Sequence, residues 1–225
     1  DNSVAFFNSN DSYPVSADTT LPFEQHRDLF YLSGVNQEET ILLIYKNNDS
    51  IYQEILFLTK PNDLLTHWEG ERLNEEKAYT ISGIKIVYWL DQLDDVIKKI
   101  MQNVKVLYLN KNEHYRAKVE TETREERFND WIKKEYPSKN VKGSNPILQK
   151  LRSVKSSLEI EIIQKACDIT EKGFRRNVNF VKTGVWEYEI EAEFSQEFIR
   201  NRSKKFAYSP IIASGKNSTK LHYME

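Results

Sequence analysis

Asp28-Leu-Phe-Tyr-Leu-Ser-Gly34 and Thr40-Ile-Leu-Leu-Ile-Tyr45 are the two apolar runs on which the predicted fold of the N-terminal region depends. Both are rich in aromatic and branched residues, and a short Gly-Val-Asn-Gln connection separates them, which is typical of neighbouring strands. A third apolar run, from Tyr52 to Thr59, follows the polar residues 47–50. Three strands joined by tight turns predict an antiparallel meander.

Outside the meander, short apolar runs alternate with segments that have helical spacing. Strands are predicted at residues 3–7, 84–88 and 104–109, and helices at 91–102 and 122–136, with one more helix through His67 and Trp68 that is capped by Asn62 or Asp63. Because strands first cluster and then alternate with helices, the pattern indicates a mixed α/β domain.

The segment Pro137-Ser-Lys-Asn-Val-Lys-Gly-Ser-Asn-Pro146 has the composition of a linker, with two prolines, a glycine and mostly polar residues. We therefore predict a domain boundary there, with one domain at residues 1–145 and another at residues 146–225.

Beyond the linker, the sequence predicts the opening of an α+β domain. Ser156-x-x-Glu159 has the spacing of a capping box, and apolar residues continue at helical intervals to about Phe180. Trp186, Ile190, Phe194 and Phe198 recur every four residues and predict a second helix. Strands are predicted at 206–213 and around Leu221, on either side of a Ser-Gly loop. Helix, helix, strand, loop and strand do not close a sheet.

Composition narrows the class of protein. Lys and Arg number 32 against 34 Asp and Glu, a net charge of −2, so we expect no nucleic-acid partner. No apolar run approaches the roughly 20 residues of a membrane span, and no signal peptide is recognisable, so we expect a soluble, cytoplasmic protein. A single cysteine, Cys167, excludes an intrachain disulfide, fits a reducing compartment and is expected to be buried.

Few residues suggest chemistry by themselves. Four carboxylates, Glu187, Glu189, Glu191 and Glu193, form i,i+4 pairs that could approach a metal, but an acidic first helical turn is the favoured interpretation. His26, His67 and His114 lack the spacing of a zinc site. His222 lies in Leu-His-Tyr after a polar loop, and a lone histidine is more often structural.

Several stretches, in order, resemble aminopeptidase P. Arg27-Asp-Leu-Phe-Tyr-Leu-Ser-Gly-Val-Asn36 with the following Ile41-Leu-Leu-Ile, and Trp68-Glu-Gly-Glu-Arg-Leu73, are similar to its N-terminal domain. Leu151-Arg-x-x-Lys-Ser-x-x-Glu-Ile and Ile212-Ala-Ser-Gly-x-Asn-x-x-x-Leu-His-Tyr223 are similar to the start of its catalytic domain. The resemblance implies a ribonuclease-H-like α/β domain of the creatinase N-terminal type, followed by the start of an α+β pita-bread domain.

The resemblance also implies an activity. Family members remove the N-terminal residue of peptides with proline in second position, using two divalent ions, usually Mn2+, bound by two Asp, one His and two Glu. None of these five ligand positions falls within residues 1–225, so we expect no metal on this chain and no activity from it alone. His222 matches the family histidine that binds substrate and donates a hydrogen bond in the transition state. Homodimers or homotetramers are implied as well.

Three alternatives remain open. Prolidase, which cleaves dipeptides, and creatinase, which uses no metal, are the nearest enzymes of this kind. A non-catalytic pita-bread protein that binds peptides or histones is a third, although His222 and the near-neutral charge speak against it. One departure from the family is Asn201-Arg-Ser-Lys-Lys205, which stands where many relatives have a Gly-rich turn.

Overall fold

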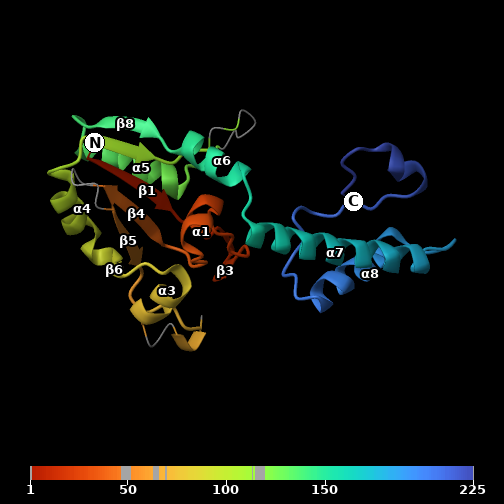
Figure 1. The fold of residues 1–225 in the computed structure, drawn as a ribbon. Helices are drawn as coiled ribbons and strands as arrows, with labels where there is room; N and C mark the ends of the chain where they lie inside the picture. The colour runs from red at the N-terminus through yellow and green to blue at the C-terminus, as the bar shows by residue number, and fades with distance from the viewer. Residues whose placement is uncertain are drawn as a thin grey trace. The chain divides into compact units, whose positions relative to one another are not determined.

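A computed structural model describes residues 2–46, 52–62, 66–68, 70–112, 114 and 120–224. The chain divides into two compact units, Asp1–Arg152 and Ser153–Glu225. Figure 1 shows the sheet and its helices in the first unit and two paired helices in the second. Within the described ranges, none of the helices combines the length and the apolar character needed to cross a lipid bilayer.

The first unit is built on one mixed sheet with the order β6-β5-β4-β1-β7-β8. Its strands are β1 Ser3–Asn8, β4 Ile41–Lys46, β5 Tyr52–Leu58, β6 Ile86–Trp89, β7 Val106–Leu109 and β8 Asn140–Gly143. β1, β4 and β5 pair in antiparallel fashion, whereas β6, β7 and β8 each lie parallel to their neighbour. A small separate hairpin joins β2 Pro14–Ser16 to β3 Thr19–Thr20.

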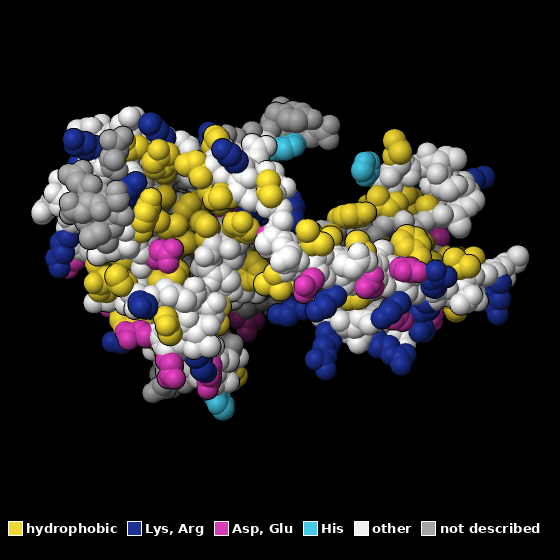
Figure 2. Space-filling view, viewed as in Figure 1, with side chains coloured by type: hydrophobic (Ala, Val, Ile, Leu, Met, Phe, Trp, Pro, Cys, Tyr) yellow, Lys and Arg dark blue, Asp and Glu magenta, His cyan; other side chains and the backbone are white. Residues whose placement is uncertain are grey.

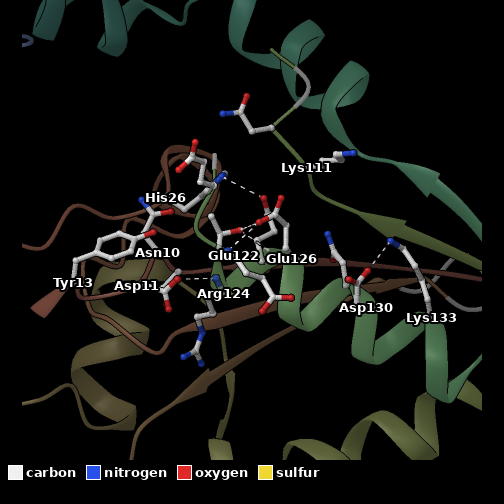
Figure 3. Close-up of a pocket in the computed structure, with 16 residues that line it drawn as sticks. Asn10, Asp11, Tyr13, His26, Lys111, Glu122, Arg124, Glu126, Asp130 and Lys133 are labelled. Carbon is white, nitrogen blue, oxygen red and sulfur yellow. Dashed lines mark hydrogen bonds and ion pairs between the residues drawn. The ribbon is translucent and has the colours of Figure 1, made fainter. Parts of the chain in front are cut away.

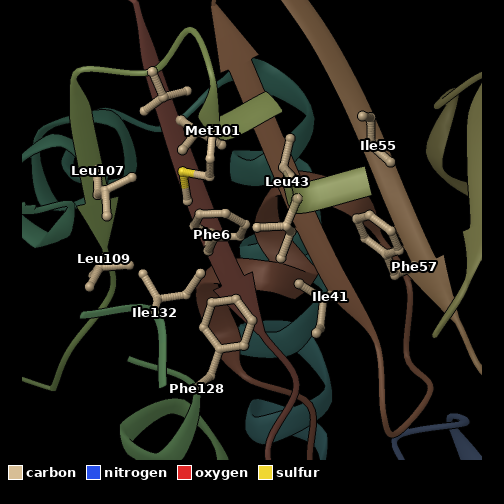
Figure 4. Packing of buried hydrophobic residues seen from close by; sticks show 13 residues of the cluster. Phe6, Ile41, Leu43, Ile55, Phe57, Met101, Leu107, Leu109, Phe128 and Ile132 are labelled. Atoms are coloured by element: carbon tan, nitrogen blue, oxygen red, sulfur yellow. The ribbon is translucent and has the colours of Figure 1, made fainter. Parts of the chain in front are cut away.

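Helices cover both faces of the sheet. Side chains alternate along β1, so that Phe6 joins the core beneath α4 Leu93–Met101 and α5 Arg124–Glu135, and Phe7 joins the opposite core. Figure 4 shows the first core, with Phe6 between the sheet residues and Phe128 of α5. The opposite core lies beneath α1 Arg27–Ser33, α3 Glu75–Ser82 and α6 Asn145–Ser153. The predicted α/β class is confirmed.

The strand predicted at residues 28–34 is wrong, because Arg27–Ser33 forms helix α1. The His26 side chain caps its start by accepting a hydrogen bond from the Asp28 amide. Gly34 ends it with a left-handed φ of 69°, which glycine adopts without steric cost. Leu29 and Ser33 are buried one turn apart, so burial on a helical face overrode the strand propensity of this apolar run. The predicted three-strand meander is therefore wrong in its first member: β4 and β5 pair in antiparallel fashion as expected, but the other neighbour of β4 is β1, which the chain reaches through β2, β3 and α1.

The predicted linker instead contains the edge strand β8, and its last residues begin α6. Residues 140–143 pair in parallel with β7. Pro137 precedes the strand and Pro146 lies in the first turn of α6, so neither proline interrupts the pairing. A proline-rich composition is therefore compatible with an edge strand as well as with a linker.

The second unit consists mainly of α7 Ser157–Phe180 and α8 Glu187–Arg200, as predicted from the helical spacing. The two helices pack closely where Gly173 faces Phe194. A Cβ atom at Gly173 would lie 2.7 Å from the Phe194 ring, so a glycine is required for this approach. Phe174, Phe198 and Phe206 surround the same ring.

The two strands predicted near the C-terminus do not form. Within the described residues 120–224, no strand follows β8, and residues 215–219 form a short 3-10 helix, η2 Gly215–Thr219. An isolated strand leaves its N–H and C=O groups unpaired, and the helical unit offers no neighbouring strand. Cys167 was expected to be buried but is exposed. Its face of α7 lacks a covering layer, and Figure 2 shows hydrophobic side chains exposed on this helical pair.

The capping box of α7 gives a first testable prediction. Ser156 accepts a hydrogen bond from the Glu159 amide, and the Glu159 carboxylate accepts one from the Ser156 amide at 2.9 Å. We expect Ser156→Ala to lower the free energy of unfolding of this unit by about 1 kcal/mol. Thermal unfolding followed by circular dichroism measures the loss. Ser157→Ala, the same change one residue later, is the control, and equal melting of the two variants would mean that the cap contributes nothing.

Candidate functional site

Glu187, the first residue of α8, organises the C-terminal segment. Its carboxylate accepts hydrogen bonds from the backbone N–H of Ser214 at 2.5 Å and from Asn217 Nδ2 at 3.1 Å. These bonds, the Ser214 amide first, hold the pKa of Glu187 below its ordinary value. The loop that was predicted to present His222 is therefore tied to the start of α8.

A cavity of about 640 Å³ lies between the start of α8 and residues 209–224. Trp186 and Tyr188 stack at 6.0 Å on one side of it, and Tyr223 and Met224 also line it. His222 lies on the turn that follows η2, next to these lining residues, and its side chain is exposed. An accessible imidazole beside a cavity can exchange a hydrogen bond with a bound molecule.

The acidic series on α8 behaves largely as an acidic helix start. Glu189 accepts from the Trp186 amide at 2.7 Å, and Glu193 pairs with Arg176 of α7 at 2.5 Å. Across the described part of the chain, no group of three or more His, Cys, Asp or Glu side chains could hold a metal ion. The residues present here therefore do not fit the pair of divalent ions that the resemblance implies.

A second polar site lies in the first unit, where the loop before α1 meets the start of α5. Figure 3 shows His26 facing the carboxylates at the beginning of that helix. His26 Nε2 lies 3.8 Å from Glu125 Oε2, and its Nδ1 accepts from the Asp28 amide at 3.3 Å. A cavity of about 670 Å³ opens beside these two side chains.

The two facing groups are shifted away from their charged forms. Burial, followed by the charge of Asp28, raises the pKa of Glu125 to about 7. Burial also lowers the pKa of His26, although Asp28 acts against that shift. Asp28 itself accepts hydrogen bonds from Arg152 at 2.6 Å and Asn110 at 3.1 Å, so its negative charge is held in place beside Glu125.

The sequence pattern alone did not single out Glu125. The signal was present, because Glu125, Phe128, Asn129 and Ile132 follow one another at helical spacing and all four are buried. Two polar residues therefore occupy the buried face of α5. A capping box formed by Thr123 and Glu126 fixes where the helix starts, and hence which face Glu125 is on.

The raised pKa of Glu125 predicts a pH-dependent stability. Below about pH 4.5 the carboxyl is protonated in the folded and unfolded chains alike, and between pH 4.5 and about 7 the unfolded chain loses its proton first, so stability falls as pH rises. We expect Glu125→Gln to be more stable than the parent at pH 8, by about 3 kcal/mol at most, and equally stable at pH 4.

Urea denaturation at both pH values measures this difference. Glu135→Gln, the same change at an exposed position of α5, is the matched control and should show no such dependence. His26 has the opposite effect, since its lowered pKa reduces stability as pH falls below 6.5, but it is present in all three proteins. An equal difference at pH 4 and pH 8 would contradict the assigned burial of the Glu125 charge.

Two protein-family models match most of this chain. The family model described as "Aminopeptidase P, N-terminal domain" matches residues 1–108, and "Metallopeptidase family M24" matches residues 161–225. An Xaa-Pro aminopeptidase from Haemophilus influenzae is 30% identical over 211 residues, which is 92% of this chain. The chain belongs to the aminopeptidase P family. The family membership expected from the sequence is thereby confirmed, together with an N-terminal domain followed by the start of an M24 domain.

Other similar proteins are also named as aminopeptidases of this family. An Xaa-Pro aminopeptidase from Escherichia coli is 26% identical over 212 residues, 93% of this chain. A Bacillus anthracis structure, provisionally assigned as an aminopeptidase P, superposes with a TM-score of 0.89 and 31% identity over 98% of this chain and 52% of its own. The chain spans about half the length of the curated relatives it matches, 46% of the H. influenzae protein and 48% of the E. coli protein.

Proposed function

We propose that this chain is part of an Xaa-Pro aminopeptidase, which removes the N-terminal residue from peptides that have proline in second position. The observation that carries the proposal is the ordered match of both family models, 1–108 and 161–225, within a chain that aligns over 92% of its length with an Xaa-Pro aminopeptidase. The relatives' names supply the substrate class, and the proposal extends it to this chain.

In this proposal, His222 is the residue of the chain that contacts substrate. Its exposed side chain and the neighbouring cavity are compatible with a hydrogen bond to a peptide carbonyl oxygen. Divalent ions, Mn2+ by family resemblance, would polarise that carbonyl and activate water. Their ligands are proposed to lie outside residues 1–225, since the described residues include no group of three or more His, Cys, Asp or Glu that could hold a metal ion.

The remaining parts of the proposal follow from the family resemblance. They are a homodimer or homotetramer, a cytoplasmic location, and proline-containing peptides as the substrates. A single cysteine in residues 1–225 means that no disulfide forms within this stretch, which supports the proposed reducing location.

The test uses the protein as its source organism produces it, captured with an antibody against residues 1–225. Its intact mass is first compared with the 26.6 kDa of these residues. A larger mass would show that the protein has further residues, among which the metal ligands can be sought. The protein is then incubated with an Xaa-Pro tripeptide and an Xaa-Pro dipeptide, with Mn2+ or with EDTA. We expect release of the first residue from the tripeptide, with Mn2+ only.

Other outcomes separate the alternatives. Cleavage of the dipeptide alone would assign prolidase activity instead. Cleavage of neither peptide in the presence of Mn2+ would contradict a peptidase, and retention of histones at physiological salt would then favour the non-catalytic alternative.

A further inference from the structure

The cavity of about 670 Å³ in the first unit has more acidic than basic side chains in its described lining. Six described carboxylates line it, against the three cationic side chains of Lys111, Arg124 and Lys133. The six are Asp11, Glu120, Glu122, Glu125, Glu126 and Asp130. Asp11 pairs with Arg127 at 2.5 Å and Asp130 with Lys133 at 3.3 Å (Figure 3 labels Asp11, Asp130 and Lys133), so two of the six are already neutralised.

Within the described part of the chain, two buried acceptors of residues that line the cavity lack a hydrogen-bond partner. They are Glu125 Oε1 and Asn129 Oδ1, whose residues are only 9% and 6% exposed. The two residues are four apart on α5 and so lie on one face of the helix. Asn129 Nδ2 donates to the Asn110 carbonyl at 2.8 Å, which fixes the amide and leaves its oxygen for another donor. Buried acceptors without partners are rare, because each has lost its bonds to water.

Among the residues that the structure describes, no Lys or Arg forms an ion pair with Glu125 to offset its charge. His26 Nε2 is 3.8 Å away, beyond hydrogen-bond length, and burial holds that imidazole toward its neutral form by lowering its pKa. Asp28 and Glu126 add further negative charge around the same carboxylate. A group that enters this site therefore needs donors for two acceptors and a positive charge.

We propose that this cavity binds small molecules through a primary ammonium group, which donates to Glu125 Oε1 and Asn129 Oδ1. An ammonium carries three donors, no acceptor and a compact positive charge, which matches both requirements. A water molecule would supply donors but no charge. A metal ion fits less well, since hard cations take six or more oxygen ligands and the described residues include no cluster suited to a metal. This proposal does not rest on the peptidase assignment.

Titration calorimetry on the 225-residue chain at pH 8, where Glu125 is ionised, tests the proposal. One arm uses putrescine, a free diamine, and the other uses Gly-Gly-Gly, whose ammonium is a peptide N-terminus. Tetramethylammonium chloride, which has the charge but no donor, and N-acetylated Gly-Gly-Gly are the ligand controls. We expect saturable binding of putrescine, of Gly-Gly-Gly or of both. We expect neither control ligand to bind with a similar affinity.

Variants connect the binding to the named residues. Glu125→Gln keeps the side-chain shape and removes the buried charge, so the protein still folds, and we expect it to weaken binding by about tenfold or more. Glu135→Gln should bind as the parent does. The proposal is overturned by the absence of saturable binding in both arms up to about 10 mM, by equal binding of tetramethylammonium, or by unchanged affinity in Glu125→Gln.

Discussion

Replacing His222 with alanine is expected to lower kcat/KM for an Xaa-Pro tripeptide by about 100-fold or more, the effect of removing one hydrogen-bond donor to developing negative charge. This prediction rests on the proposed role of His222, which comes from the resemblance of Leu221-His-Tyr223 to the family, and on its exposed side chain next to residues that line the cavity. A donor that acts mainly in the transition state changes kcat more than KM. The measurement is steady-state kinetics on the protein with its complete encoded sequence.

The control variants separate a catalytic effect from a structural one. His114→Ala removes another histidine with an exposed side chain, in the first unit, and should leave kcat/KM unchanged. Bound metal in His222→Ala, measured by elemental analysis, should equal that of the parent, because the assigned role does not involve ligation. Near-normal turnover in His222→Ala would show that the assignment is wrong, and a loss of metal would show that the residue acts through the metal site instead.

The loop that carries His222 also shows where sequence pattern fails. Residues 206–213 and 221–223 have the apolar character of strands, yet they form irregular structure and a short 3-10 helix within the described unit. Strand propensity is expressed only where a neighbouring strand is available to pair with, and the described helical pair provides none. The local pattern indicated where the loop and His222 lie in the sequence, but it carried no information on whether a neighbouring strand is present.

For the other helices and strands, the strength of the periodic pattern decided whether the prediction was right. The spacing of apolar residues located α4, α5, α7 and α8, because long amphipathic helices carry their own periodic signal. Residues 28–34 were assigned to a strand because seven residues are too few to distinguish the two periods, and α1 covers residues 27–33 instead. The edge strand β8 was hidden by its polar, exposed composition, since an edge strand buries little.

The two candidate sites also differ in how much the sequence alone indicates about them. The role proposed for His222 comes from a family resemblance that covers this residue and stays a prediction, whereas Glu125 required knowledge of which side chains lack partners. A capping box placed Glu125 on the buried face of α5, but no sequence pattern reports that Glu125 Oε1 and Asn129 Oδ1 are both unsatisfied. That property depends on the loop before α1, which is distant in sequence and contributes His26.

Phe6→Ala is expected to destabilise the first unit by about 3–5 kcal/mol, the usual cost of emptying a buried aromatic site. Phe6 is 1% exposed, lies opposite Leu43 on β4 and Leu109 on β7, and its ring is 5.1 Å from that of Phe128. It therefore joins three strands to α5, and a cavity there cannot be closed by moving one side chain. A domain stability of roughly 5–15 kcal/mol makes this a large fraction of the total.

Urea denaturation followed by tryptophan fluorescence measures the change, since Trp89 and Trp131 pack against the two cores of this unit. Phe30→Ala is the matched control, because Phe30 is 51% exposed on α1 and the same atoms are deleted at little cost. We expect the transition midpoint to fall sharply for Phe6→Ala with an unchanged slope, which would mean that both proteins unfold the same structure. Similar midpoints for the two variants would contradict the packing of β1 at the centre of the sheet, and with it the frame that holds α5 and Glu125 in position.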